Sequence, residues 1–306
     1  MPLDPQAEAF LAREAALNLP DISEIGTAAR YGGHAEVDVA GPVGDGATIA
    51  HRFITTPTAD LPVRIYTPKK PGPYRGFVYF HGGGWVLNHI DRYEAQLVEI
   101  AEKTDSVVLS INYQKSPEHK FPIPHDDCYA ALKWMIENAA ELNIDKNKIG
   151  VGGDSAGGNL AAGISLRARD EKVQLAYQLL IYPATKLDFD TDSYLNNADG
   201  YGLRRKGMIW FWDQYLSTGD KNNPYAVPDI APDHKGLAPA IIPTAEYDVL
   251  RDDGISYAAR LEAAGNKVIY KDFEGQIHGF FNQGKYVEAA YLLRSWIIEQ
   301  INSLLA

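Results

Sequence analysis

The sequence contains a single cysteine among its 306 residues, Cys128. One thiol cannot form a disulfide within the chain, and it cannot supply the several thiolates of a structural zinc site. The sequence also has no H-x-x-x-H or C-x-x-C pattern, so it predicts no metal centre. Because disulfides are rare in reducing compartments, the near absence of cysteine indicates a cytoplasmic protein.

Long apolar stretches are absent as well. No window approaches a membrane-spanning length of uninterrupted apolar residues, and the first residues do not pair a basic segment with an apolar one. The sequence therefore predicts neither a membrane span nor a signal peptide. The formal net charge is −11, and the basic side chains are scattered. An acidic surface repels phosphates, so nucleic acids and anionic membranes are not expected partners.

Two nucleotide-binding patterns are missing too. The sequence has no G-x-x-x-x-G-K-[ST] segment that could cradle phosphates. Residues 150–155 begin like a dinucleotide fingerprint, but Ser155 stands where the last glycine belongs. We therefore expect no cofactor.

What the sequence does contain is a regular alternation of strand and helix patterns, preceded by a helical segment over residues 6–18. Segments 48–54 and 63–66 alternate like antiparallel strands, whereas the denser apolar runs at 75–80 and 106–113 indicate strands buried on both faces. Further strand candidates, at 148–153, 175–181, 239–245 and 267–273, are separated by helical patterns. This alternation predicts an α/β fold with a mostly parallel central sheet and helices on both faces.

One segment breaks the alternation. The connection between the strand that ends near Tyr182 and the strand that begins near Pro239 is polar at first and then aromatic, with a helix expected over 208–216. So long a connection is usually a functional insertion. We therefore predict a helical cap, made of the N-terminal segment 1–46 and an insertion over about 185–237, on a catalytic domain that spans residues 47–306.

A G-x-S-x-G pattern joins a strand candidate to a helix candidate. Residues 153–157 read Gly-Asp-Ser-Ala-Gly, with Ser155 at the centre. Glycines on both sides of the serine permit a sharp turn that exposes its hydroxyl. A serine hydroxyl becomes a good nucleophile only when a histidine takes its proton, and a carboxylate must orient that histidine. Taken alone, the pattern could equally be a glycine-rich turn with a spectator serine.

The partners of such a serine are expected downstream, the acid before the histidine. Only two of the eight histidines follow Ser155. His278 comes soon after a strand candidate, whereas His234 lies in the polar insertion and fits less well. Asp248 follows the preceding strand candidate and is the preferred acid. Three other carboxylates nearby compete with it, as acids or as mere surface charges and helix caps: Glu246, Asp252 and Asp253.

A run of three glycines follows the strand candidate at 75–80. Residues 81–85 read His-Gly-Gly-Gly-Trp. Attack on a carbonyl places negative charge on its oxygen, which backbone N–H groups can stabilise, and consecutive glycines let bare backbone approach that oxygen. A loop of this kind supplies one donor, and the residue after the nucleophile, here Ala156, supplies another. We expect His81 to hold the loop rather than to act as a base.

Together these segments resemble the hormone-sensitive-lipase-like family of carboxylesterases, whose bacterial members include acetyl esterases. The resemblance rests on four motifs in the family's order: residues 81–85, residues 153–159, Glu-Tyr-Asp-Val-Leu-Arg-Asp at 246–252, and His-Gly-Phe at 278–280. It implies an α/β-hydrolase fold with a cap. It also implies that Ser155 is the nucleophile and that Asp248 and His278 are its partners. The oxyanion donors that it implies are Gly82, Gly83 and Ala156.

One further segment resembles the family only in part. Residues 112–119 are similar to a family segment that reads Tyr-Arg-Leu-Ala-Pro-Glu, but they depart from it at Gln114, Lys115 and Ser116. A helper role for this loop is therefore not implied, and we expect Pro117 and Glu118 to be structural.

The predicted function is hydrolysis of small, short-acyl carboxylic esters through an acyl-enzyme. The expected partners are a small ester and, in a homodimer, a second copy of the chain. We expect Trp85, Trp210 and Phe211 to line the substrate site. Two other functions use the same sequence features: an amidase or formamidase with the same triad, and a non-catalytic receptor on this fold. The presence of His278 disfavours the receptor.

Overall fold

The computed structural model describes residues 1–31 and 39–306, and its centre is an eight-stranded sheet in the order β1-β2-β4-β3-β5-β6-β7-β8. β2 is antiparallel to β1 and β4, and all pairings from β4 to β8 are parallel. The predicted α/β class and mostly parallel sheet are confirmed. The strands are β1 (Ala47–Thr55), β2 (Asp60–Pro68), β3 (Tyr74–Phe80), β4 (Ser106–Ile111), β5 (Ile144–Asp154), β6 (Gln178–Ile181), β7 (Ala240–Tyr247) and β8 (Val268–Ile277).

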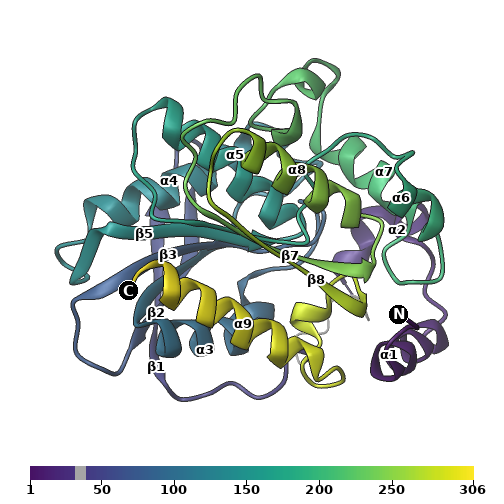
Figure 1. The fold of residues 1–306 in the computed structure, drawn as a ribbon, viewed down its shortest axis with the longest axis horizontal. Coiled ribbons are helices and arrows are strands. Elements are labelled where there is room, and N and C mark those ends of the chain that lie inside the picture. Colours follow the sequence, from purple (N-terminus) through teal and green to yellow (C-terminus); the bar gives the residue numbers. More distant parts are fainter. Residues whose placement is uncertain (32–38) are drawn as a thin grey trace.

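Helices cover both faces of the sheet (Figure 1). One face carries α3 (Glu94–Thr104) and α9 (Ala289–Leu304), and the other carries α4 (Ile123–Glu137), α5 (Ala156–Asp170) and α8 (Arg251–Ala263). In the part of the chain that the structure describes, no helix is both long and apolar enough to cross a membrane. The remaining α-helices are α1 (Pro5–Ala16), α2 (Ile22–Ile25), α6 (Asp192–Asn196) and α7 (Arg205–Tyr215), and the short 3-10 helices are η1 (Gly26–Arg30), η3 (Ile90–Tyr93), η4 (Thr218–Asn222), η5 (Pro228–Ile230) and η6 (Phe280–Asn282).

The central strands are buried on both faces, as their dense apolar sequences predict. In β3, Val78 and Phe80 belong to the core under α4 and α5, whereas Phe77 and Tyr79 belong to the core under α3 and α9. All four side chains are fully buried. The period of two along the strand therefore supplies both hydrophobic layers from one short segment.

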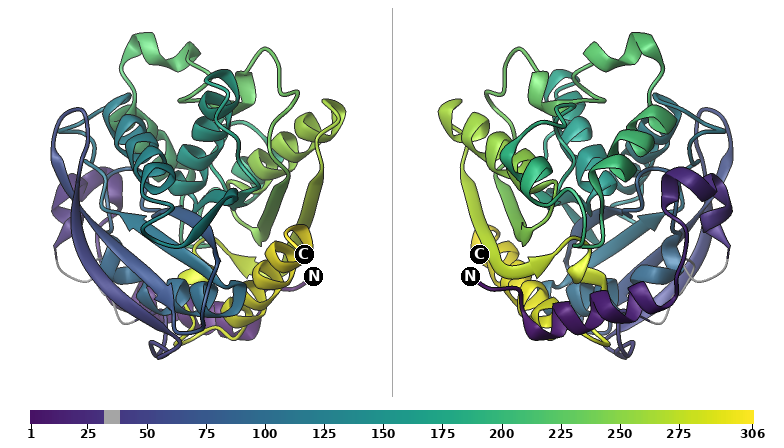
Figure 2. Two further views of the ribbon diagram at one scale, coloured as in Figure 1. Left: turned by 90° about the vertical axis from the view of Figure 1, so that its left-hand side faces the viewer. Right: turned by 90° about the vertical axis from the view of Figure 1, so that its right-hand side faces the viewer.

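The two segments predicted to form the cap are in contact. Helix α2 packs against α7 of the insertion, and α1 lies outside the layers, alongside the end of β8 (Figures 1 and 2). Residues 32–38 of the predicted 1–46 segment lie outside the described residues. The division into a cap and a catalytic domain stays a prediction.

The parallel strands bring four candidate segments to one edge of the sheet. The triple-glycine segment follows β3, Ser155 follows β5, Asp248 follows β7 and His278 follows β8. Because the carboxyl ends of parallel strands share one edge, residues far apart in the sequence meet there.

The turn from β5 into α5 lies directly against β3. A Cβ atom at Gly157 would lie 1.9 Å from the carbonyl oxygen of Phe80, and one at Gly153 would lie 2.3 Å from the same oxygen. The neighbouring atom is backbone in the middle of the sheet, so it cannot move aside. Glycine at these positions is thus required by the packing of the turn and not only by its bend.

We predict that Gly157→Ala lowers the free energy of unfolding by about 3 kcal/mol, because the added methyl group must push β3 and α5 apart. Gly219→Ala is the matched control, since a Cβ there has no neighbour within 4 Å, and it should change stability by less than about 0.5 kcal/mol. Urea unfolding followed by circular dichroism measures both. Equal stability of the two variants would contradict this packing argument.

Candidate active site

Ser155 occupies the turn between β5 and α5 in a strained conformation. Its backbone angles are φ 57° and ψ −120°, a region that residues other than glycine rarely adopt. The conformation is held by a hydrogen bond from the Ser155 N–H to the carbonyl of Ile181, at 2.8 Å. The turn thereby lifts the hydroxyl above the sheet edge, as the G-x-S-x-G pattern predicts.

His278 lies between Ser155 and Asp248. Its Nε2 is 3.0 Å from Ser155 Oγ, and its Nδ1 is 2.6 Å from Asp248 Oδ2. With the proton placed on Nδ1, the ring donates to the carboxylate and accepts the serine proton at Nε2. The other carboxylate oxygen, Oδ1, accepts the N–H of Leu250 at 2.9 Å. The fully buried carboxylate is therefore fixed from two sides.

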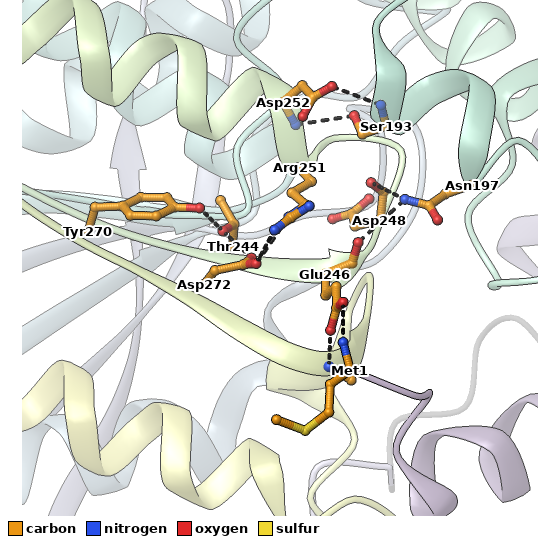
Figure 3. A network of polar contacts seen from close by, with 11 residues as sticks. Met1, Ser193, Asn197, Thr244, Glu246, Asp248, Arg251, Asp252, Tyr270 and Asp272 are labelled. Atoms are coloured by element: carbon orange, nitrogen blue, oxygen red, sulfur yellow. Dashed lines mark hydrogen bonds and ion pairs between the residues drawn. The ribbon is translucent and has the colours of Figure 1, made fainter.

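The competing carboxylates all have other partners, and Figure 3 shows those of Glu246 and Asp252. Glu246 pairs with the amino group of Met1 at 2.9 Å, and Asp252 accepts the N–H of Ser193 at 2.8 Å. Asp253 is buried beneath the start of the insertion, where burial raises the pKa of its carboxyl well above the ordinary value. Among the four acids, Asp248 is thus the one that reaches the histidine.

A tyrosine that belongs to no sequence motif packs on His278. The ring of Tyr182, at the end of β6, lies 4.7 Å from the imidazole, centre to centre, and is fully buried. Its φ of 35° is unusual for a bulky residue. This contact limits the movement of the imidazole. The other downstream histidine, His234, is buried in the insertion against the carbonyl of Pro228.

The structure corrects one predicted oxyanion donor. The N–H of Gly82 donates to Asp154 Oδ1 at 2.8 Å and also faces the hydroxyl of Tyr93 at 3.1 Å, so it is already used. Within the described residues, the amides of Gly83, Gly84 and Ala156 have no such acceptor, and Gly83 and Gly84 line the cavity in front of Ser155. The loop amides that are open to a substrate oxygen are therefore those of Gly83 and Gly84, and not that of the predicted Gly82.

Asp154, the residue before the nucleophile, anchors this glycine loop. Besides the Gly82 amide, its carboxylate accepts the hydroxyls of Tyr79 at 2.7 Å and Tyr93 at 3.2 Å, and the side-chain amide of Asn282 at 3.2 Å. Burial raises the pKa of Asp154, and the hydrogen bonds from Tyr79, Gly82 and Tyr93 oppose that rise. One carboxylate thus joins the glycine loop after β3, the nucleophile turn after β5 and η6 after His278. Apart from the position of Asp154 next to Ser155, no pattern in the sequence indicates this role.

A cavity of about 180 Å³ opens onto Ser155 and His278. Phe211 lines it, as predicted, together with Leu203 and Met208. Trp85 was expected in the wall but is not there. Its ring is fully buried in the core, stacked on Tyr215 at 4.4 Å and tilted against Trp212 at 4.6 Å.

Trp210 is also absent from the cavity lining. It is the neighbour of Phe211 on α7, and successive helical residues point about 100° apart. Its ring therefore turns toward the N-terminal segment. The Cζ2 atom of the ring lies 3.8 Å from the point that a Cβ atom would occupy if Gly26 carried a side chain. Among residues 1–31 and 39–306, no group of three or more histidine, cysteine or acidic side chains is arranged to hold a metal ion.

The fold and the Ser–His–Asp geometry are those of a hydrolase of the α/β class. Residues 77–282 match the family of proteins with the alpha/beta hydrolase fold. The chain therefore belongs to this family, within its hormone-sensitive-lipase-like branch of esterases.

Relatives of known name agree with this assignment. The carboxylesterase NlhH of Mycobacterium tuberculosis is 41% identical over 237 residues, which is 76% of this chain and 74% of the relative. The arylacetamide deacetylase of Bos taurus is 35% identical over 72% of each chain. Among solved structures, an ester-hydrolase from the metagenome of Lake Arreo, complexed with a bipyridine phosphonate derivative, superposes with a TM-score of 0.93 at 32% identity and covers 98% of both chains.

We predict that Asp154→Asn lowers kcat for p-nitrophenyl acetate roughly 10- to 100-fold and changes KM little, because the glycine loop loses its charged anchor and with it the alignment of the oxyanion donors. Tyr79→Phe is the matched control: it removes one donor to Asp154 but leaves the bond to Gly82, so its effect should be much smaller. A folded Asp154→Asn protein with unchanged kcat would refute this role.

Proposed function

We propose that the chain is a serine carboxylesterase that hydrolyses small esters with short acyl groups. The observation that carries the proposal is the position of His278, within hydrogen-bond reach of both the Ser155 hydroxyl and the Asp248 carboxylate. The relatives named as carboxylesterase and ester-hydrolase support the same activity.

In the proposed reaction, Ser155 Oγ attacks the ester carbonyl while His278 Nε2 takes its proton. The imidazolium that forms is stabilised by Asp248, to which Nδ1–H is already bonded at 2.6 Å. His278 then gives the proton to the leaving alcohol, and the acyl group stays on Ser155. Water, activated by the same imidazole, releases the acid and restores the serine.

Three backbone amides are placed to stabilise the negative charge of each tetrahedral intermediate. Gly83 and Gly84 come from the loop after β3, and Ala156 comes from the first turn of α5. Each donor contributes about 3 kcal/mol to the transition state when it is held in position. The start of α5 adds its helix dipole, which favours an anion at the same point.

The size and lining of the cavity favour short acyl chains. Its volume of about 180 Å³ is below the roughly 300 Å³ at which sites for drug-sized ligands begin. Phe211 and Met208 of α7 line the cavity, and both side chains are buried. A long chain would have to displace these side chains from the core of the insertion.

Amide hydrolysis is a second candidate, since one relative is named arylacetamide deacetylase. The same residues would act, and His278 would protonate the leaving amine. Comparing matched aryl acetates and acetanilides as substrates distinguishes the two. The ratio of kcat/KM for the ester to kcat/KM for the amide is compared with the ratio of their uncatalysed hydrolysis rates. The ester proposal requires the first ratio to be larger than the second.

We further propose a cytoplasmic location, supported by the single, buried cysteine, because disulfides are rare in reducing compartments. A homodimer is part of the same proposal, and light scattering of the purified protein tests it.

Ser155→Ala should abolish hydrolysis of p-nitrophenyl acetate and labelling by a fluorophosphonate probe, because among residues 1–31 and 39–306 no other hydroxyl is bonded to a histidine that is itself bonded to an acid. Circular dichroism should show an intact fold, since the alanine methyl fits the space of the serine. Full activity of this variant would overturn the proposal.

Phe211→Ala should shift selectivity toward longer acyl chains, because it removes the ring that limits the cavity. The ratio of kcat/KM for p-nitrophenyl octanoate to that for the acetate should rise about tenfold or more. This magnitude is expected because the space left by the ring accommodates a few more methylene groups of the acyl chain. This ratio does not depend on how much of each preparation is folded. Trp210→Ala, on the same helix but outside the cavity, is the control. An equal change of this ratio in both variants would show that Phe211 does not limit the substrate site.

A further inference from the structure

The direction of each proposed oxyanion donor in the glycine loop is set by the carbonyl of its own peptide group. A peptide group is planar and almost always trans, so its N–H points away from its C=O. The amide of Gly83 shares a peptide group with the carbonyl of Gly82, and the amide of Gly84 shares one with the carbonyl of Gly83. The groups that bind these two carbonyls therefore decide where the two amides point.

The amide of Gly84 is directed by backbone groups of the same loop. The carbonyl of Gly83 accepts the N–H of Val86 at 3.1 Å and the N–H of Leu87 at 2.7 Å. Both donors belong to the turn that follows the glycines. Backbone bonds therefore suffice to orient this peptide group.

The amide of Gly83 is directed by two side chains. The carbonyl oxygen of Gly82 lies 2.8 Å from His81 Nδ1 and 3.2 Å from Asn88 Nδ2. A carbonyl oxygen can only accept, so both nitrogens donate to it. Burial lowers the pKa of His81 well below its ordinary value, so the ring is neutral and its one proton is on Nδ1. With two donors on its oxygen, this peptide group cannot rotate without losing a hydrogen bond.

The backbone and surroundings of Asn88 suit this contact. Its φ is 64°, a left-handed conformation that asparagine adopts more readily than most residues. Asn88 Nδ2 also donates to the hydroxyl of Tyr93 at 3.3 Å, and that hydroxyl is bonded to Asp154 at 3.2 Å. The side chain of Asn88 is half-buried and lines the cavity in front of Ser155. It is thus held in place from a second side.

Of the two side chains on the Gly82 carbonyl, Asn88 is the one that can be removed cleanly. The ring of His81 is fully buried and stacked on Tyr113 at 4.3 Å, so its replacement would disturb the core. Asn88 is only half-buried, and glycine adopts its left-handed backbone without strain. Asn88→Gly therefore deletes the amide group and leaves the chain path free to stay as it is.

We propose that Asn88 is a positioning residue of the oxyanion site: its side-chain amide holds the Gly82 carbonyl and thereby directs the N–H of Gly83 toward the oxygen of the tetrahedral intermediate. This proposal rests on the proposed esterase function. The oxyanion forms after the substrate has bound, so the contribution of Asn88 belongs to the transition state. Its loss therefore affects kcat and leaves KM nearly unchanged.

Asn88→Gly should lower kcat for p-nitrophenyl acetate about tenfold or more, because one of the three amides loses its alignment. The pH dependence of kcat/KM should not move, since His278 keeps its bonds to Ser155 and Asp248.

Inhibition by 1,1,1-trifluoro-2-butanone separates this role from general damage to the protein. Ser155 Oγ adds to the ketone carbon, the serine proton passes to His278, and the ketone oxygen becomes an oxyanion. The Ki of this inhibitor does not depend on how much of the preparation is folded. It should rise in Asn88→Gly by about the same factor as kcat falls.

Asn143→Gly is the matched control. Asn143 also has a left-handed backbone, with φ 53°, but it is exposed and does not line the cavity. This variant should keep the wild-type kcat and Ki. Asn88→Asp is a second test variant, which preserves the shape of the side chain but has no hydrogen to donate when ionised. Its Ki should rise at least as much as that of Asn88→Gly.

An unchanged Ki in either folded variant of Asn88, or an equal rise in Asn143→Gly, would overturn the proposal. A raised KM with unchanged kcat would overturn it too, because Asn88 would then act as a substrate contact. A crystal structure of the wild-type adduct with the ketone needs no variant: an Asn88 amide turned away from Gly82 would contradict the proposal. Absence of both turnover and fluorophosphonate labelling in the wild-type protein would instead refute the esterase function, so the two failures are distinguishable.

Discussion

The close contact between the β5–α5 turn and β3 is the constraint on which the site depends. The carbonyl of Phe80 lies so near Gly153 and Gly157 that neither position can carry a side chain. This contact fixes the height of Ser155 relative to the glycine loop, because the loop begins directly after Phe80. The end of β3, Ser155 and the glycine loop are thus positioned by one packing interaction.

Asp154 extends this constraint to the third segment of the site. Its carboxylate binds the glycine loop through Gly82, and it binds η6 through Asn282. A buried carboxylate is costly unless donors surround it, and here four donors do so. The arrangement fixes the glycine loop, which carries the proposed oxyanion donors, before a substrate arrives, and such preorganisation is a large source of electrostatic stabilisation in enzymes.

Much of this could be predicted from the sequence, because the signals are local. The alternation of strand and helix patterns predicts the mostly parallel sheet. The order of Ser155, Asp248 and His278 along the chain predicts a triad, and the structure brings these three residues together. Strand limits were less accurate: β5 begins at Ile144 and β8 continues to Ile277, since pairing with neighbouring strands extends both beyond their apolar runs.

The parts that the sequence could not provide depend on contacts between distant segments. Gly82 and Gly84 look alike in a run of three glycines, and only the position of Asp154 decides which amide is already bonded. Trp85 looked like a cavity wall because it follows the glycines. Its left-handed backbone, with φ 59°, instead accompanies a ring packed against Trp212 and Tyr215 of α7. Tyr182 belongs to no motif, and its contact with His278 follows from packing alone.

The central claim is that Ser155, His278 and Asp248 act together beside the amides of Gly83, Gly84 and Ala156. A crystal structure of the protein after reaction with a small alkyl phosphonate ester tests it most directly. The account predicts a phosphorus atom bonded to Ser155 Oγ, with a phosphonyl oxygen about 2.7–3.1 Å from those three amides and Gly82 still bonded to Asp154. Phosphorus on another residue, or an oxygen held by Gly82 instead of Gly84, would contradict it.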